Sequence, residues 1–329
     1  MSLSTSQILS FLSLKGIGPK AVQILNSYVV DNTVSLSSAD DMLDLINYCI
    51  SNKIIPRIKN TFEVWDIDAA ISYSSRILEE SEKLGIHSIG YNDDLFPNAL
   101  RSIVDAKGKC NAPLILYVKG NVDVLNMKRA IAIIGTREPT NAGVKAGLFF
   151  SEQFAKANFN IVSGLALGCD TTAHKGALKA GGITTAFVAS GLDLPIYPSE
   201  NKNLAEDIIA NNGALISEYP LGTVAMANRF VERDRLQSGL SQATLAIQTG
   251  VKGGTLHAVN ATLDNHKPLY MVQFKGDELL HDKVQGNQLF LSTKKANPIS
   301  TENYQDIILS LCSDNLNSCS SQPSLFDCL

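Results

Sequence analysis

The chain has 329 residues, of which 45% are hydrophobic and 18% are charged, and its formal net charge is −4. This composition is typical of a globular protein, and the length favours two domains. It excludes a polycation, so a nucleic-acid site would have to be a local basic patch whose affinity depends on salt.

Residues 1–84 are predicted to form a small all-helical domain, because apolar residues recur there at helical spacing. The segment Leu14–Lys20, with the sequence LKGIGPK, lies between the first two predicted helices. Its two glycines permit a tight turn, and Pro19 suits the first turn of a helix. This is a helix-hairpin-helix (SAM-like) pattern, whose backbone N–H groups can meet a phosphate. A tight turn in a plain helical bundle is the alternative interpretation.

Residues 85–128 are predicted to connect this domain to a second one, which spans residues 129–311. There, short β-branched strands alternate with helical segments. The predicted strands are Ile131–Ile134, Phe159–Ser163, Thr184–Ala189, Ala214–Ser217, Leu245–Thr249 and Leu269–Gln273. Strands buried on both faces with helical crossovers indicate an α/β, Rossmann-like, doubly wound parallel sheet. Residues 312–329 are rich in Ser, Asn and Asp, which predicts a flexible tail.

The ends of these strands carry residues that suit an anion. Ligands of open parallel sheets bind beyond the carboxyl ends of the strands. Glycine lets the backbone approach an anion, and arginine offers a two-pronged donor. The segment Thr249–Thr255 opens a helix, whose dipole favours an anion. The candidate phosphate-binding residues are Gly135, Thr136, Arg137, Ser163, Gly164, Lys175, Lys202, Arg233, Arg235 and Lys252.

No complete catalytic or cofactor motif accompanies these segments. The sequence lacks G-x-G-x-x-G after the first strand and lacks G-x-x-x-x-G-K-[ST], so neither a dinucleotide cofactor nor P-loop hydrolysis is supported. We expect His174 to be a packed imidazole, because no nucleophile is placed beside it. Asp170 is expected to hold a turn or cap a helix. The sequence therefore predicts a binding protein without catalytic residues or a cofactor.

The compartment is expected to be the cytoplasm. No apolar run reaches the ~20 residues that span a bilayer, and Met1–Leu14 has no signal-peptide pattern. The 6 cysteines are scattered, without C-x-x-C spacing and without a histidine cluster, which argues against a metal site.

The motifs of the second domain resemble those of the DNA-processing A (DprA/Smf) family. The similar segments are AIIGTREPT, VSGLALGCDTTAHKGAL, YPSENKNL, GALISEYPLGT, FVERDRLQSGLS and NQLFLSTKKANPI, preceded by YNDDLFPNALRSI and APLILYVKG. They follow the family's order over roughly residues 85–300. The helical N-terminal region is similar to the family's N-terminal domain.

The resemblance implies a single-stranded-DNA-binding protein that protects the strand and hands it to the RecA recombinase in transformation or recombination. It also implies a homodimer. The family's DNA-binding residues correspond here to Arg137 with Gly135 and Thr136, Ser163-Gly164, Lys202, and the pair Arg233 and Arg235. Such groups can follow phosphates without reading bases.

The sequence departs from the family's pattern at three points. Asp234 stands in the middle of the family's R-N-R motif, where it can orient the two arginines or weaken phosphate binding. The turn after the first strand has Gly-Thr-Arg in place of the commoner Gly-Ser-Arg. We expect no C-terminal winged-helix domain, because few residues follow the last predicted helix.

The tail contains a further candidate motif. Gln322, Leu325 and Phe326 resemble the Q-x-x-L-F peptide by which bacterial proteins dock on the replicative sliding clamp. Two adjacent apolar anchors suit insertion into a pocket. The alternative is a hydrophobic tail that folds back on the protein.

Two other functions fit the same sheet. A phosphoribohydrolase-like enzyme would use a glycine-rich P-G-G-x-G-T-x-x-E loop, but Lys252–Ala258 lacks the glutamate. A nucleotide-binding sensor would use the same anion-binding strand ends, since one phosphate pocket resembles another.

Overall fold

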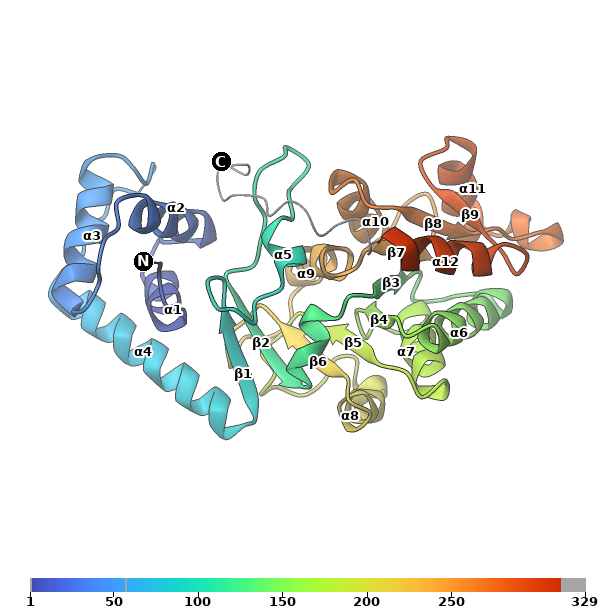
Figure 1. Ribbon diagram of the computed structural model, residues 1–329, viewed down its shortest axis with the longest axis horizontal. Helices are drawn as coiled ribbons and strands as arrows, with labels where there is room; N and C mark the ends of the chain where they lie inside the picture. Colours follow the sequence, from blue (N-terminus) through green and yellow to red (C-terminus); the bar gives the residue numbers. More distant parts are fainter. Residues whose placement is uncertain (1, 57, 315–329) are drawn as a thin grey trace. The chain divides into compact units, whose positions relative to one another are not determined.

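A computed structural model describes residues 2–56 and 58–314 (Figure 1). The chain forms two compact units, one made of Met1–Phe96 with Pro113–Tyr117, the other of Pro97–Ala112 with Val118–Leu329. The predicted connecting segment 85–128 is thus divided between the two units. Among the described residues, no helix is long and apolar enough to cross a membrane.

The first unit is mainly helical. Its elements are α1 (Thr5–Ser13), α2 (Pro19–Asp31), α3 (Ala39–Ser51), α4 (Val64–Lys83) and β1 (Ile86–Gly90). Ser4 and Ser38 cap α1 and α3 by accepting hydrogen bonds from first-turn N–H groups. Gly16 has a φ of 88° in the turn between α1 and α2, and Pro19 occupies the first position of α2. These residues have the positions that the helix-hairpin-helix pattern predicts.

The second unit contains the predicted alternation of strands and helices. Its strands are β2 (Ile115–Gly120, of which the unit holds the last three residues), β3 (Ala130–Ile134), β4 (Asn160–Ser163), β5 (Thr184–Phe187), β6 (Ala214–Ser217), β7 (Ala243–Ala246), β8 (Leu269–Val272) and β9 (Asn297–Ile299). Its α-helices are α5 (Asn98–Arg101), α6 (Asn141–Lys156), α7 (Cys169–Lys179), α8 (Lys202–Ala210), α9 (Ala227–Leu240), α10 (Thr255–Asp264), α11 (Gln285–Ser292) and α12 (Tyr304–Asp314).

The strands β6-β5-β4-β3-β7-β8-β9 follow one another in this order across the sheet, and each neighbouring pair is parallel. The order reverses at β3, where the chain first adds strands on one side and then, from β7, on the other. Such a reversal point is where open α/β sheets bind ligands.

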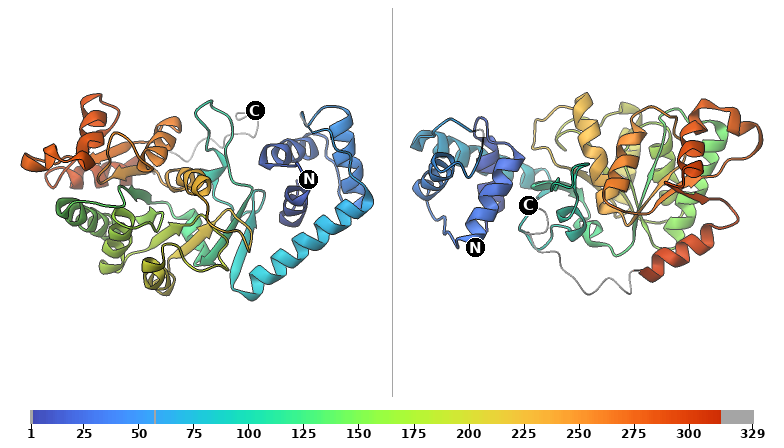
Figure 2. Two further views of the ribbon diagram at one scale, coloured as in Figure 1. Left: turned by 180° about the vertical axis from the view of Figure 1, so that it is seen from behind. Right: turned by 90° about the horizontal axis from the view of Figure 1, so that it is seen from above.

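Helices cover both faces of this sheet (Figures 1 and 2). Ile131 and Ile133 of β3 point to the face covered by α6, α7 and α12, where they join a core of buried aromatic and aliphatic side chains. Ile134 points to the opposite face, where it packs with Ala258 and Val259 of α10. This alternation explains why β3 is apolar at every position.

One predicted boundary differs from the structure. The predicted tail begins at residue 312, but α12 continues to Asp314 because Leu311 and its helical neighbours pack into the core beside α6. The polar segment Ala227–Leu240, which carries the predicted site residues Arg233 and Arg235, forms the helix α9.

Candidate nucleic-acid interface

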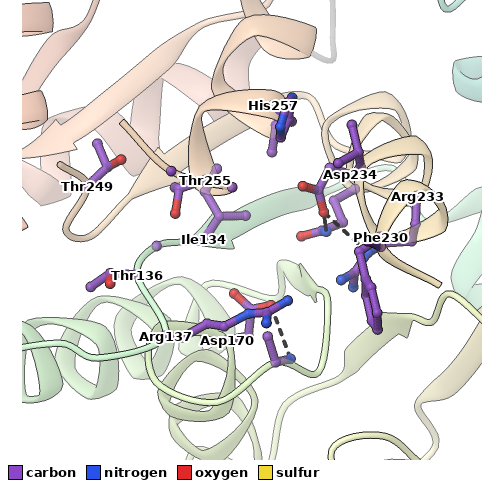
Figure 3. A pocket seen from close by; sticks show the side chains of 18 of the residues that line it. Ile134, Thr136, Arg137, Asp170, Phe230, Arg233, Asp234, Thr249, Thr255 and His257 are labelled. Carbon is purple, nitrogen blue, oxygen red and sulfur yellow. Dashed lines mark hydrogen bonds and ion pairs between the residues drawn. The ribbon is translucent and has the colours of Figure 1, made fainter. Parts of the chain in front are cut away.

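A pocket with a volume of about 790 Å³ lies at the carboxyl ends of β3 and β7, beside α9 (Figure 3). All of its lining residues belong to the second unit. The sequence-predicted residues that line it are Gly135, Thr136, Arg137, Arg233 and Lys252. The predicted residues Ser163, Gly164, Lys175, Lys202 and Arg235 are not among the lining residues.

The loop after β3 is held in place by backbone contacts. The N–H of Thr136 donates to the carbonyl of Gln248 at 2.8 Å, and the carbonyl of Thr136 accepts from the N–H of Cys169 at 3.1 Å. Thr140 caps α6, and its hydroxyl also accepts from Nε2 of Gln248 at 2.8 Å. The backbone around Arg137 is therefore fixed before any ligand arrives.

Arg137 is exposed and lies beside aromatic rings. Its Cζ is 5.6 Å from the centroid of the Phe230 ring, within cation–π range. The ring of Tyr197 lies 5.5 Å from that of Phe230, and Tyr197 is 56% exposed. This wall of the pocket combines a positive charge with an exposed aromatic ring. In proteins that bind single-stranded nucleic acids, positive charges bind the phosphates and aromatic rings stack on the bases.

Arg233 lines the same pocket but is only 3% exposed. Its Nη1 donates to the carbonyl of Phe187 at 2.6 Å and also to the carbonyl of Gly164. Its Nε lies 3.3 Å from Oδ1 of Asp234, an ion pair that lacks the alignment of a hydrogen bond. A side chain at position 164 would collide with the guanidinium. Arg233 is therefore an internal link between β4, β5 and α9, with little surface left for a phosphate.

Two carboxyl groups lie around Arg233 (Figure 3). Asp170 Oδ2 accepts from the N–H groups of Gly164 at 3.1 Å and Ala166 at 3.3 Å, so it holds the turn after β4, as predicted. Burial raises the pKa of Asp170, and Arg233 opposes the rise. Burial raises the pKa of Asp234 to about 6, with Arg233 and Arg137 lowering it and Asp170 raising it.

The opposite wall is the glycine-rich loop that leads from β7 into α10. Its position is set by the buried Asn287, whose Oδ1 accepts from the N–H of Thr249 at 2.9 Å and whose Nδ2 donates to the carbonyl of Ile247 at 2.9 Å. Lys252 is exposed on this loop. No side chain caps α10 at Gly254, and the N–H groups of Leu256 and His257 donate to the carbonyls of Gly253 at 3.3 Å and Gly254 at 2.9 Å. The positive end of the helix dipole favours an anion at this position.

The remaining predicted cations lie elsewhere on the second unit. Arg235 makes a two-pronged pair with Glu218, at 2.7 and 2.6 Å, and its Nε donates to the carbonyl of Asn111 at 2.9 Å. Lys202 is exposed at the start of α8, and the preceding Asn201 donates to the carbonyl of Leu165 at 2.8 Å. Lys202 therefore lies close to the turn after β4. Lys175 is exposed, beyond the first turn of α7.

The hydroxyl of Ser163 is used inside the sheet, where it donates to the carbonyl of Ile133 at 2.6 Å. His174 is fully buried, and its Nδ1 lies 2.7 Å from the hydroxyl of Thr184. Burial lowers the pKa of His174 to about 3, so the ring is neutral. His174 is a packed imidazole, as predicted.

Several pocket residues were not among the sequence-predicted site residues: Tyr197, Phe230, Gln237, Thr255 and His257. A signal for Tyr197 was available, because it lies in the segment between β5 and α8, where an exposed aromatic residue is near the ligand-binding ends of the strands; Phe230 lies on α9 and is half-buried. Gln237 gave no signal, since its role depends on the course of α9.

Comparison with known proteins places the chain among DNA-processing proteins. Residues 87–311 match the model of the family described as DNA recombination-mediator protein A. The chain is 34% identical over 197 residues to the DNA processing protein DprA of Bacillus subtilis, covering 60% of this chain and 64% of that protein. It is 36% identical over 184 residues to Protein Smf of Synechocystis, covering 55% and 44%. These matches span less than two thirds of the relatives' own length.

Solved structures agree with the predicted Rossmann-like fold. The X-ray structure of DprA from Streptococcus pneumoniae has a TM-score of 0.71 at 24% identity and covers 91% of this chain and 95% of its own. A DprA structure from Helicobacter pylori has a TM-score of 0.59 at 28% identity and covers 70% and 96%. The latter concerns the single-stranded DNA binding mode of the H. pylori protein.

Proposed function

The chain belongs to the DNA recombination-mediator protein A family, and from this premise we propose that its pocket binds single-stranded DNA. The observation that carries the proposal is that two exposed cations, Arg137 and Lys252, lie on opposite walls of one pocket. The start of α10 adds the positive end of a helix dipole, which favours a phosphate, and Tyr197 adds a stacking surface. The H. pylori relative's binding of single-stranded DNA supports the same assignment.

The proposal assigns the predicted cations different roles. Arg137 and Lys252 contact phosphates directly, and Lys202 extends the path beside the turn after β4. Arg233 and Arg235 stabilise the fold around the pocket, because their guanidinium groups are already paired with carbonyl and carboxylate oxygens. Lys175 is the weakest candidate, since it lies on α7 away from the pocket lining.

We further propose that this binding protects single-stranded DNA in the cytoplasm and assists its loading onto RecA during transformation or recombination, and that the protein acts as a homodimer without catalysing a reaction. The family membership and the resemblance of the motifs support this part. The clamp-docking motif Gln322, Leu325 and Phe326 lies outside the described residues. It stays a prediction, which deletion of residues 320–329 followed by a clamp-binding measurement tests.

The test of DNA binding is the fluorescence anisotropy of a labelled oligo-dT titrated with protein at two salt concentrations. Arg137→Ala is expected to weaken binding by about 1–3 kcal/mol, as for a charge-assisted contact, and to make the salt dependence shallower. Lys156→Ala is the matched control. It removes one exposed positive charge from the end of α6, which lies at the amino ends of the strands, away from the pocket.

Three outcomes would contradict the proposal. The site assignment fails if Arg137→Ala binds oligo-dT as tightly as the parent protein at both salt concentrations. The function fails if the parent does not bind single-stranded DNA at all. Release of free base from a panel of nucleoside monophosphates would instead support the phosphoribohydrolase alternative.

A further inference from the structure

The floor of the pocket offers hydrogen-bond acceptors in place of cations. Asp234 and Gln237 lie one turn apart on α9 and both line the pocket. Gln237 Nε2 donates to Asp234 Oδ1 at 3.0 Å, which fixes the carboxylate. Gln237 is 2% exposed, and its Oε1 has no hydrogen-bond partner among the described residues. A buried acceptor without a partner costs free energy, which a ligand that supplies a donor would recover.

This floor is unsuited to phosphate. Asp234 and Asp170 place two carboxyl groups at the same end of the pocket, and Arg233 between them is already bound to two carbonyl groups. A phosphate here would meet like charge, whereas Arg137 and Lys252 are exposed on the walls and can receive it there. A bound nucleotide would therefore direct its backbone to the walls and its base to the floor.

The bases differ in how they fit a carboxylate. Guanine presents two adjacent donors, N1–H and N2–H, on its Watson–Crick edge, and these match the two oxygens of a carboxylate. Thymine presents one N–H between two carbonyl groups, and adenine and cytosine present one amino group beside an acceptor. Recognition of unstacked bases on this edge is common for single strands. The pocket volume of about 790 Å³ lies within the range of small-ligand sites and leaves room for a stacked base beside Tyr197.

We propose that the carboxylate of Asp234, positioned by Gln237, binds the Watson–Crick edge of guanine, so that the pocket prefers a guanine nucleotide. Asp234 is the specificity-determining residue and Gln237 is a positioning residue. The inference rests on the proposed binding of DNA in this pocket. The same chemistry would serve a guanine within a strand and a free guanine mononucleotide.

The experiment compares labelled oligo-dT with the same oligomer carrying isolated dG residues, spaced so that guanines cannot associate with one another. The parent protein is expected to bind the dG-containing oligomer about tenfold more tightly, in line with a good two-pronged base contact. Asp234→Asn keeps the size of the side chain but removes the charge and replaces one acceptor oxygen by an NH2 donor. It should remove the preference while oligo-dT binding persists. Glu206→Gln, an exposed single-charge change on α8, is the control and should keep the preference.

A second measurement needs no variant at Asp234. Protonation of its carboxyl would destroy the paired acceptor, and burial raises the pKa of this group to about 6. The guanine preference of the parent should therefore fall between pH 7.5 and pH 5. The charged groups facing Asp234 are Arg233 on its own helix, Asp170 on α7 and Arg137 after β3. His257 of α10 also lines the pocket, so the series is repeated with His257→Gln, which should show the same fall.

Competition with free dGMP and dAMP identifies the source of the guanine. Displacement of the oligomer by dGMP but not by dAMP supports guanine recognition and adds the free nucleotide as a ligand. A dG preference without dGMP binding supports recognition within the strand only. If oligo-dT binds and dG confers no advantage, or if Asp234→Asn keeps the preference, guanine recognition is overturned and the proposed DNA binding stands. If no oligomer binds but dGMP does, and Asp234→Asn abolishes this binding, guanine recognition stands and the DNA function fails.

Discussion

Gly168 lies directly against the backbone of Arg137: a Cβ at Gly168 would be 2.5 Å from both the carbonyl carbon and the carbonyl oxygen of Arg137. Gly168 also has a φ of 81°, a conformation that side chains disfavour. The turn into α7 therefore supports the loop that carries Arg137, and only glycine fits there.

Gly168→Ala is accordingly expected to reduce both stability and DNA binding. The positive φ and the displaced Arg137 loop together should cost about 1–3 kcal/mol of the free energy of unfolding. The affinity for oligo-dT should fall as well, because Arg137 shifts. Urea denaturation and an anisotropy titration of the same sample measure the two effects.

Gly181→Ala provides the matched control for this change. Gly181 also has a positive φ, 67°, but a Cβ there would meet nothing within 4 Å. It should lose stability and keep the DNA affinity of the parent. Equal affinities of the two variants would show that Gly168 does not position Arg137.

Arg235 and Glu218 form a partly buried ion pair, with side chains that are 16% and 14% exposed. We expect Arg235→Met to lower the free energy of unfolding by roughly 2–4 kcal/mol, because it leaves the carboxylate of Glu218 without its partner. The double variant Arg235→Met/Glu218→Leu should recover much of this loss. Chemical denaturation of the two variants measures the difference.

DNA affinity distinguishes this structural role from the phosphate contact that the sequence suggests. The measurement is made at a temperature where both variants are folded. The affinity for oligo-dT should then stay within about twofold of the parent value, because Arg235 makes no phosphate contact. A twofold change in affinity corresponds to about 0.4 kcal/mol. A tenfold loss in the double variant would return Arg235 to the DNA-binding residues.

The sequence was sufficient for the parallel sheet because its strands are buried on both faces. Ile131, Ile133 and Ile134 each meet a helix layer, so the strand is apolar throughout and its pattern is unambiguous. The strand ends could also be located, and with them the loops that carry Arg137 and Lys252. Local composition determines these features, which is why sequence alone predicts them.

The roles of the residues on α9 could not be predicted in the same way. A segment with three arginines, two acidic residues and a glutamine suggests a solvated surface, yet Arg233 and Gln237 are 3% and 2% exposed. Arg233 is buried because the carbonyl groups of Gly164 and Phe187, distant in sequence, converge on it. Only the folded chain brings these acceptors together, so sequence suggests a DNA contact where the structure shows an internal link.

Tyr197 and Lys252 should both contribute to DNA binding, and the salt dependence of the affinity should distinguish their contributions. Tyr197→Ala removes a stacking surface and is expected to weaken oligo-dT binding by about 1–3 kcal/mol without changing the salt slope. Lys252→Ala removes a phosphate contact, and the slope of log K against log salt should become shallower by about one. Titrations at four salt concentrations give both quantities. Identical slopes for the two variants would contradict this division.

His174 should make the protein sensitive to acid. Its pKa is lowered to about 3 by burial, whereas an unfolded histidine titrates near 6.5. Between these values the unfolded chain binds the additional proton, so stability rises with pH across this window and is lost as pH falls through it. From pH 7 to pH 5 the loss from this residue is about 2 kcal/mol.

The carboxyl group of Asp234 acts in the opposite direction, because its raised pKa lets the folded protein bind a proton first as pH falls below about 6. The net pH profile therefore combines two opposing residues, and a variant is needed to separate them. His174→Asn keeps a polar atom near the hydroxyl of Thr184 but cannot titrate. It should be less stable than the parent at pH 7 and should lose less stability than the parent between pH 7 and pH 5. Parallel profiles from urea denaturation at both pH values would show that the imidazole is not the group that titrates.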